Sequence, residues 1–274
     1  MGRMKIATFN VNGVNGRIAN LIEWLEESEP DIVCLQELKT SQDKFPRISL
    51  AERGYHALWV GQKSYNGVAI LSRGSAPIEI RRSLPGDTAD TQGRFLEAAV
   101  LGIHVLCIYL PNGNPQPGPK FDYKLAWFER LIRHAADLYD CGHPVIIAGD
   151  FNVVPTDEVP DIYNPRSWKD DALLQPESRA AYRKLLKQGW TDAIHKLYPD
   201  LPMYTFWDYM RKRWERDAGL RIDHLLLNKQ LKSKLVDAGV DKSVRGRPSA
   251  SDHAPVWVSI KDPAASRATM AKRR

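Results

Sequence analysis

The sequence predicts one domain of the α/β or α+β class, and three observations lead to this prediction. Short apolar runs typical of strands alternate along the chain with amphipathic segments typical of helices. No linker-like stretch interrupts this alternation before residue 261. The chain has 274 residues, of which 43% are hydrophobic, so it can bury a core without the help of disulfide bonds. The pattern does not predict the order of the strands.

The first half of the chain contains most of the expected strands. Residues 17–28 place Ile18, Leu21 and Leu25 on one face, which predicts a helix. Residues 32–35 are a continuous apolar run, as expected of a strand that is buried on both faces. Further strands are predicted over residues 4–9, 66–72, 94–100 and 104–110.

The second half contains the clearest helix, over residues 121–139, where apolar side chains recur at helical spacing. Another helix is expected over residues 177–188 and should stop at Gly189, because glycine is favoured just after a helix. The proline-rich segment 111–119 can form neither a helix nor an inner strand, so we expect a rigid loop. The remaining strands are predicted over residues 143–149, 221–227 and 254–260.

The net charge is +6, and it is unevenly distributed. The stretch from residue 261 to the C-terminus contributes +4, which leaves +2 for the rest of the chain. We therefore expect a folded domain over residues 1–261 and a basic, flexible tail over residues 262–274. A basic balance favours a polyanionic partner, although ordinary solvation explains the charge of the tail equally well.

The cysteines and the apolar runs indicate the compartment. Cys34, Cys107 and Cys141 are widely spaced and lie in apolar runs, so we expect reduced, buried thiols in a cytoplasmic protein, associated with the nucleoid if the source is prokaryotic. No cysteine or histidine pair has the close spacing of a zinc site. No apolar run approaches the ~18 to 20 residues of a membrane helix, so no membrane partner is expected.

Polar residues stand at the ends of several expected strands. Any one of them could be a helix cap or a turn residue. If these ends converge, however, several carboxylates face one another, which is unfavourable unless a cation lies between them. All-oxygen ligands favour Mg²⁺ or Mn²⁺ over zinc, and such a cation beside histidine and aspartate suits phosphoester hydrolysis. The residues are Asn10, Gln36, Glu37, Tyr109, Asp150, Asn152, Asp223, Asp252 and His253.

Six short motifs occur in order along the chain: FNVNG from Phe9, LQE from Leu35, YLPN from Tyr109, GDFN from Gly149, LRID from Leu220 and SDHAPV from Ser251. Together they resemble the exonuclease III family of abasic-site endonucleases, within the endonuclease/exonuclease/phosphatase superfamily, over about residues 4–260. The resemblance implies a four-layer α/β sandwich, in which two mostly antiparallel β-sheets pack face to face with helices outside. Residues 1–261 would be its catalytic domain.

The resemblance also implies a metal centre at one edge of the sandwich. Glu37 would be the principal Mg²⁺ ligand, with Mn²⁺ as a substitute, and Asn10 would lie nearby. Asp252 would lie close to the metal or to its waters. Whether the site holds one metal ion or two stays open.

Five further residues receive catalytic roles from the resemblance. Asp150 would activate or orient the attacking water, and Asn152 would position the phosphate. His253 would contact the scissile phosphate, with Asp223 orienting its ring. Tyr109 would contact the phosphate or support the leaving group. Either Asp150 or His253 could be the general base.

Substrate binding is assigned to a second group of residues. Asn112 matches a position that lines the site. By position, Phe206, Leu220 and Ile222 would form an apolar pocket that accepts a baseless deoxyribose and excludes a normal nucleotide, whereas Trp207 is expected in the core. Basic residues in two stretches could grip phosphates or simply be solvated: Arg211, Lys212 and Arg213, and then Lys242, Arg245 and Arg247.

These features predict a Mg²⁺-dependent enzyme of base excision repair that cuts the phosphodiester 5′ to abasic sites. It would also act as a 3′→5′ exonuclease and clean 3′ ends on duplex DNA, working as a monomer. One alternative is a phosphodiesterase or phosphatase on a non-DNA phosphoester. Another is a non-catalytic nucleic-acid-binding relative, which the complete set of acidic and histidine residues disfavours.

Overall fold

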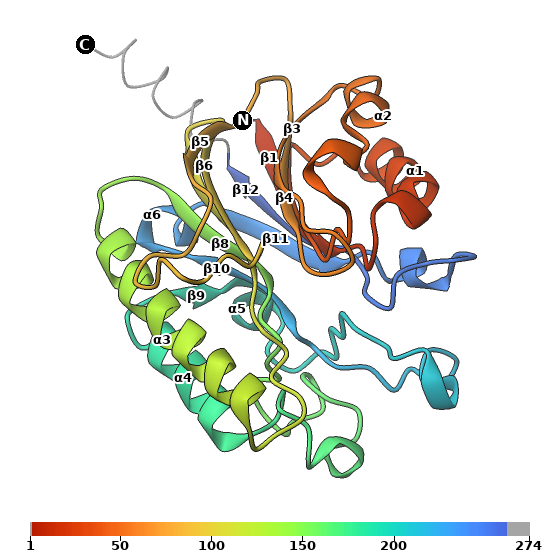
Figure 1. Ribbon diagram of the computed structural model, residues 1–274, viewed down its shortest axis with the longest axis vertical. Coiled ribbons are helices and arrows are strands. Elements are labelled where there is room, and N and C mark those ends of the chain that lie inside the picture. Colours follow the sequence, from red (N-terminus) through yellow and green to blue (C-terminus); the bar gives the residue numbers. More distant parts are fainter. Residues whose placement is uncertain (1, 262–274) are drawn as a thin grey trace.

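The computed structural model describes residues 2–261, in which two six-stranded sheets pack face to face (Figure 1). In the first sheet only β1 and β2 are parallel, and every other pair is antiparallel. Its strands, in spatial order, are β11 (Leu235–Val240), β12 (Val256–Lys261), β1 (Arg3–Asn10), β2 (Ile32–Gln36), β4 (Val68–Arg73) and β3 (Tyr55–Val60).

The second sheet has the same character, because only β7 and β8 are parallel. Two sheets of this kind confirm the mostly antiparallel arrangement that the sequence predicts. The strands, in spatial order, are β5 (Ile78–Arg81), β6 (Phe95–Val100), β7 (Ile103–Tyr109), β8 (Val145–Asp150), β10 (Asp223–Leu227) and β9 (Thr191–Asp192).

Helices cover the outer face of each sheet and complete the four layers (Figure 1). Helices α1 (Ile18–Ser28) and α2 (Arg47–Ala51) pack on the first sheet. Helices α3 (Pro119–Tyr139) and α4 (Pro176–Leu186) pack on the second. Two short helices, α5 (Ala193–Leu197) and α6 (Lys229–Lys232), lie against β10.

The sandwich explains the continuous apolar runs of the sequence. Neighbouring residues of a strand face opposite sides of its sheet, so Ile6 packs between the sheets while Ala7 packs under α1. In β8, Ile146 faces the other sheet and Ile147 faces α3 and α4. Because both sides are apolar, these strands need no polar alternation.

Every helix and strand expected from the sequence is present, with ends shifted by a few residues. Gly189 follows α4 as expected and has a φ of +112°. Among the α-helices and strands of residues 2–261, seven short ones were not predicted, namely β3, β5, β9, β11, α2, α5 and α6. One expectation is wrong: Cys34 and Cys107 are buried, but Cys141 is partly exposed because it lies in the turn after α3.

The proline-rich segment forms a loop that connects β7 to α3, as the sequence predicts. The basic tail expected over residues 262–274 lies outside the described residues. Among the helices that the structure describes, none is both long enough and apolar enough to cross a lipid bilayer.

Candidate active site

The strand pairing brings the polar residues of the sequence to one edge of the sandwich. In the parallel pairs, strand ends coincide, so Asn10 lies beside Gln36 and Tyr109 lies beside Asp150. Strand β10 runs antiparallel to β8, so its first residue, Asp223, pairs with Asp150, the last residue of β8. The convergence expected from the sequence is therefore a consequence of register.

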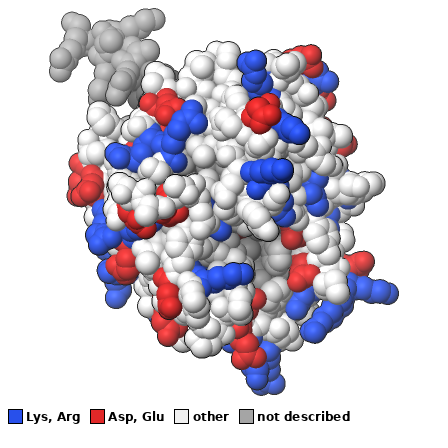
Figure 2. All heavy atoms as spheres, in the orientation of Figure 1, with Lys and Arg blue, Asp and Glu red and all other residues white. Residues whose placement is uncertain are grey.

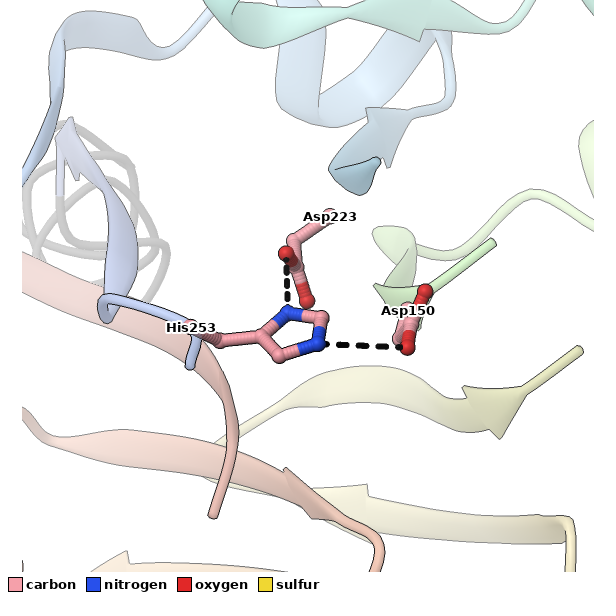
Figure 3. Close-up of side chains that lie close together, drawn as sticks. All are labelled: Asp150, Asp223 and His253. Atoms are coloured by element: carbon pink, nitrogen blue, oxygen red, sulfur yellow. Dashed lines mark hydrogen bonds and ion pairs between the residues drawn. The ribbon is translucent and has the colours of Figure 1, made fainter. Parts of the chain in front are cut away.

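Three buried side chains form the centre of the site (Figure 3). His253 Nδ1 lies 2.8 Å from Oδ2 of Asp223, and His253 Nε2 points toward Asp150 at 3.9 Å from Oδ2. The Thr205 hydroxyl donates to the same Oδ2 of Asp223 at 2.6 Å. The imidazole is therefore fixed on one side and free to act on the other, toward Asp150.

Asp150 is held in place by two donors. The backbone N–H of Asn152 donates to its Oδ1 at 2.8 Å, and the Asn10 side chain donates to its Oδ2 at 3.0 Å. Asn152 has a φ of +46°, a left-handed conformation that asparagine tolerates better than most residues. This turn directs the N–H of Asn152 back at the carboxylate that it follows.

The centre perturbs the acidity of its members. Burial and the Asp223 carboxylate raise the pKa of Asp150, although His253 and the donors from Asn152 and Asn10 oppose this. Burial alone would lower the pKa of His253, but the carboxylates around it, Asp223 foremost and then Asp150 and Asp252, together outweigh burial and raise that pKa. A charged imidazole beside two carboxylates is suited to hold an anionic phosphate and to manage a proton.

The residues expected to bind the metal lie beside this centre. Glu37 follows β2, and its carboxylate lies 2.9 Å from Nζ of Lys39. Asp252 accepts a hydrogen bond from the Asn12 side chain at 3.0 Å, and the backbone N–H of Asn12 donates to Oδ1 of Asn10. Asn12 thus links two of the three expected ligands.

The donor set fits a hard divalent cation. The negative charges of Glu37, Asp150 and Asp252 all act on the Tyr109 hydroxyl and, together with burial, raise its pKa well above the usual value. Carboxylate and amide oxygens at one place are the ligands that Mg²⁺ and Mn²⁺ prefer. Among residues 2–261, however, the only group of three or more such side chains with ligand atoms within 4.8 Å of one another is Asp150, Asp223 and His253, so Glu37 and Asp252 are not part of that group.

The loops after β7 and β8 support the centre. The Asn112 side chain donates to Oδ1 of Asn152 at 3.2 Å, and the Asn152 side chain donates to the carbonyl of Leu110 at 2.8 Å. Half-buried Tyr109 lies under the Arg94 guanidinium, which is 4.8 Å from the centre of its ring. The structure therefore places Tyr109, Asn112 and Asn152 together, as expected.

Of the three residues expected to form an apolar pocket, only Phe206 has an exposed surface. Half-buried Phe206 has its ring centre 4.9 Å from that of His253. Leu220 and Ile222 are buried in the cluster behind it, so they support the wall rather than form its surface. Trp168, which sequence reasoning missed, packs edge-on against Phe206 with 6.2 Å between ring centres.

The first basic stretch lies at the tip of a loop beside the site. Arg211 and Lys212 are exposed, and Figure 2 shows basic side chains gathered over this loop, at the lower right. Arg213 lies over the Trp168 ring at 4.1 Å, so its guanidinium is already partly engaged. The side chains of Arg211 and Lys212, by contrast, are open to solvent.

The second basic stretch differs from expectation. Arg245 is buried and donates to the carbonyl of Trp207 at 2.9 Å, and Trp207 is a core residue as expected. Lys242 pairs with Asp217 at 2.7 Å, and Arg247 pairs with glutamates of α1. Arg245 is therefore shielded from phosphates, whereas Lys242 is exposed and Arg247 is half-buried, each in an ion pair at the surface.

Several residues that build the site were not predicted from the sequence. Ser251 begins the SDHAPV motif, and its hydroxyl joins the carbonyl of Asn10 to the N–H of His253. The Thr205 hydroxyl fixes Asp223, and Thr205 directly precedes Phe206, which was expected in the pocket. Their places within a motif or next to an expected site residue were the available signal. The others are Asn12, Lys39, Arg94, Lys124 and Trp168.

A model of the endonuclease/exonuclease/phosphatase family matches residues 7–253. The chain belongs to this family. Exodeoxyribonuclease III of Haemophilus influenzae is 34% identical over 268 residues, covering 94% of this chain and 100% of that protein. DNA repair nuclease APEX1 of Danio rerio is 30% identical, covering 94% of this chain and 82% of that protein.

Solved structures of the family have the same fold. A 3′ phosphatase from Neisseria, NExo, bound to a product DNA hairpin, superposes with a TM-score of 0.90 at 39% identity, covering 94% of this chain and 99% of that one. An AP endonuclease from Archaeoglobus fulgidus gives 0.89 at 36% identity, with the same coverage. The predicted resemblance to the exonuclease III family is confirmed, and so is the phosphodiester hydrolase class.

Proposed function

We propose that this protein is a DNA repair nuclease that requires Mg²⁺, cuts the phosphodiester 5′ to an abasic site and leaves a 3′-hydroxyl. The observation that carries the proposal is His253, held between Asp223 and Asp150 where the strand ends of both sheets meet. The nuclease relatives support the same class of substrate. Duplex DNA with abasic sites or free 3′ ends is the proposed partner, and a monomer suffices.

Within the centre, Asp150 would act on the attacking water and His253 on the phosphate. Asp150, with its pKa raised, is able to take a proton from the attacking water, and its two donors aim it. His253, with its pKa raised by Asp223, carries a positive charge to the phosphate oxygens. The water oxygen forms a bond to phosphorus as the bond from phosphorus to the 3′-oxygen breaks.

Other groups would act on the leaving 3′-oxygen, on the side of the phosphate opposite to the attacking water. A tyrosine is protonated at neutral pH, and burial together with three carboxylates raises the pKa of Tyr109 further, so Tyr109 can donate a hydrogen bond to that oxygen. Mg²⁺, or Mn²⁺ in its place, would be held by Glu37, Asn10 and Asp252 and would neutralise charge on the phosphate and leaving oxygens. Asn152 and Asn112 would hold the phosphate in position.

The surroundings of the centre suit a damaged duplex. Phe206 offers an apolar face beside His253, backed by buried Leu220 and Ile222, and a sugar without a base can rest against it. Arg211 and Lys212 at the loop tip would contact backbone phosphates. Affinity for DNA should therefore depend steeply on salt.

Processing of 3′ ends is the second proposed activity on the same site. It is supported by the Neisseria relative, which is described as a 3′ phosphatase. A terminal 3′ group also reaches the centre without the extrusion of a nucleotide, so the same residues could act on it.

An end-labelled duplex with one tetrahydrofuran abasic analogue tests the proposal, in Mg²⁺ and in EDTA. An undamaged duplex with a recessed 3′ end runs beside it. A single Mg²⁺-dependent cut 5′ to the analogue is expected, and a ladder from the recessed end would add the exonuclease. If neither duplex is cut in Mg²⁺ or Mn²⁺, the nuclease proposal is wrong. Activity on small phosphoesters would then favour a phosphodiesterase or phosphatase on a non-DNA substrate. DNA binding without turnover would favour a non-catalytic nucleic-acid-binding protein.

A further inference from the structure

Lys124 is a lysine on the buried face of helix α3, and its side chain has no exposed surface. Its ammonium donates to three backbone carbonyls, those of Asn112 at 3.0 Å, Asn152 at 2.5 Å and Ala172 at 3.4 Å. An ammonium has three donors, so all of them are used. Within residues 2–261 no carboxylate lies within ion-pair distance of it.

Such a group is expensive to bury. Burial lowers the pKa of Lys124 to about 7, and the more distant carboxylates Asp171 and Asp150 offset this only in part. A methionine or leucine would fill the same space in the helix without this penalty. The packing around the side chain is also tight, because a Cβ added to Gly113 would lie 2.6 Å from Cδ of Lys124.

The three carbonyls belong to three loops that surround the candidate active site. Asn112 lies in the loop after β7, Asn152 in the loop after β8, and Ala172 in the segment before α4. The side chains of Asn112 and Asn152 bond to each other at 3.2 Å, and the N–H of Asn152 aims Asp150. Lys124 therefore holds, from behind, the backbone of two residues whose side chains line the site.

We infer that Lys124 is a positioning residue, which fixes Asn112 and Asn152 so that their amides and the Asp150 carboxylate meet the scissile phosphate in register. The inference rests on the proposed function. A displacement of about 1 Å in such groups can lower the rate about 100-fold. Lys124 itself would touch neither the substrate nor the metal.

A control residue with a similar structural role lies at the far end of the same strands. Asn228 is fully buried and follows β10, and its side chain donates to the carbonyl of His143 and accepts from the N–H of Val145. It ties two segments together as Lys124 does, but beside the start of β8 rather than its end at Asp150. Asn228→Ala should thus lower stability and leave the site intact.

The test measures kcat and KM on the tetrahydrofuran duplex, with urea unfolding of each variant as the measure of stability. Lys124→Met should lower kcat about 100-fold, with a smaller change in KM. Lys124→Arg should recover part of the loss because it keeps the charge and the donors. Asn228→Ala should change kcat less than about threefold at a comparable loss of stability. If Lys124→Met does not fold, Lys124→Gln replaces it.

A double-mutant cycle separates positioning from a general loss of structure. In a background that carries Asn112→Ala and Asn152→Ala, Lys124→Met should lower the remaining activity much less than it does in the wild-type background, because the two amides that it positions are gone and only the backbone N–H that aims Asp150 is left. An equal loss in both backgrounds would overturn the inference, and so would an Asn228→Ala variant as impaired as Lys124→Met. A wild-type protein that cuts neither duplex would instead overturn the proposed function, and the inference with it.

Discussion

The substitution Asp223→Asn should abolish most of the activity while preserving the shape of the site. In the native protein one oxygen of Asp223 accepts from both His253 and Thr205, while its other oxygen is buried and has no hydrogen-bond partner in the described part of the chain. The amide of an asparagine can adopt two orientations here, and both are unfavourable. Its NH₂ group either replaces the buried, unpartnered oxygen, or it faces His253 Nδ1 and forces the imidazole into the wrong tautomer.

The expected loss of rate in Asp223→Asn follows from the lost negative charge. Two unit charges about 4 Å apart interact by about 4 kcal/mol at an effective dielectric constant of 20. If that stabilisation is felt by the charged imidazole in the transition state, its loss lowers the rate about 1,000-fold. The Asp223 carboxylate lies 2.8 Å from Nδ1 of His253 and both are buried, so solvent cannot replace it.

Single-turnover cleavage of the tetrahydrofuran duplex at saturating enzyme is the suitable assay, because it isolates the chemical step. Thr205→Ser, which keeps the hydroxyl, is the matched control and should lose less than about tenfold. A rate for Asp223→Asn within about tenfold of wild type would show that the carboxylate does not support His253.

Three further predictions concern the metal, the stability and the DNA. Glu37→Gln keeps the size of the side chain but removes its charge, so a higher Mg²⁺ concentration should be needed for half-maximal rate, and an unchanged Mg²⁺ titration would refute this role. Although burial opposes it, hydrogen bonds from two histidines lower the pKa of Glu97 to about 2. The stability that this carboxylate contributes should be complete above pH 4.5 and disappear toward pH 2, and urea unfolding of Glu97→Gln should lack that part of the pH dependence. Arg211→Ala with Lys212→Ala should reduce the slope of log affinity against log salt by about 2, measured by fluorescence anisotropy with a DNA duplex, and an unchanged slope would exclude them from the interface.

The sequence is sufficient for the strands that are buried on both faces and for long amphipathic helices. Strands β2 and β8 are continuous apolar runs, so they are recognisable without a partner. Strand β5 is exposed along its whole length, and β11 mixes half-buried and buried residues without alternation. Their strand conformation depends on the neighbours that they pair with, which no local pattern reveals.

The site could be predicted as a set of residues but not as a geometry. Asp150 and Asp223 meet because β8 and β10 pair in one register, although 72 residues separate them in the chain. Thr205 and Lys124 act through contacts between distant segments. The sequence nevertheless contains a signal for Lys124, because this lysine stands at helical spacing from Phe121, on the apolar face of its helix.

Basic residues were the least predictable part. The sequence treats Arg211 and Arg245 alike, as cations of basic stretches that could grip phosphates. In the structure Arg211 is exposed, whereas Arg245 is buried between the rings of Tyr209 and Trp214 and bonded to a carbonyl. Composition gives the number of cations, but only the fold decides which of them reach solvent.

The central claim is that water, activated at Asp150, breaks the phosphodiester 5′ to an abasic site. The most direct measurement is cleavage of a duplex with a natural abasic site in ¹⁸O-labelled water, followed by mass spectrometry of both ends. A 3′-hydroxyl and a 5′-phosphate that carries one ¹⁸O are expected, and Asp150→Asn should lose this product although DNA binding persists. A 3′-unsaturated aldehyde without ¹⁸O, or undiminished cleavage by Asp150→Asn, would contradict it.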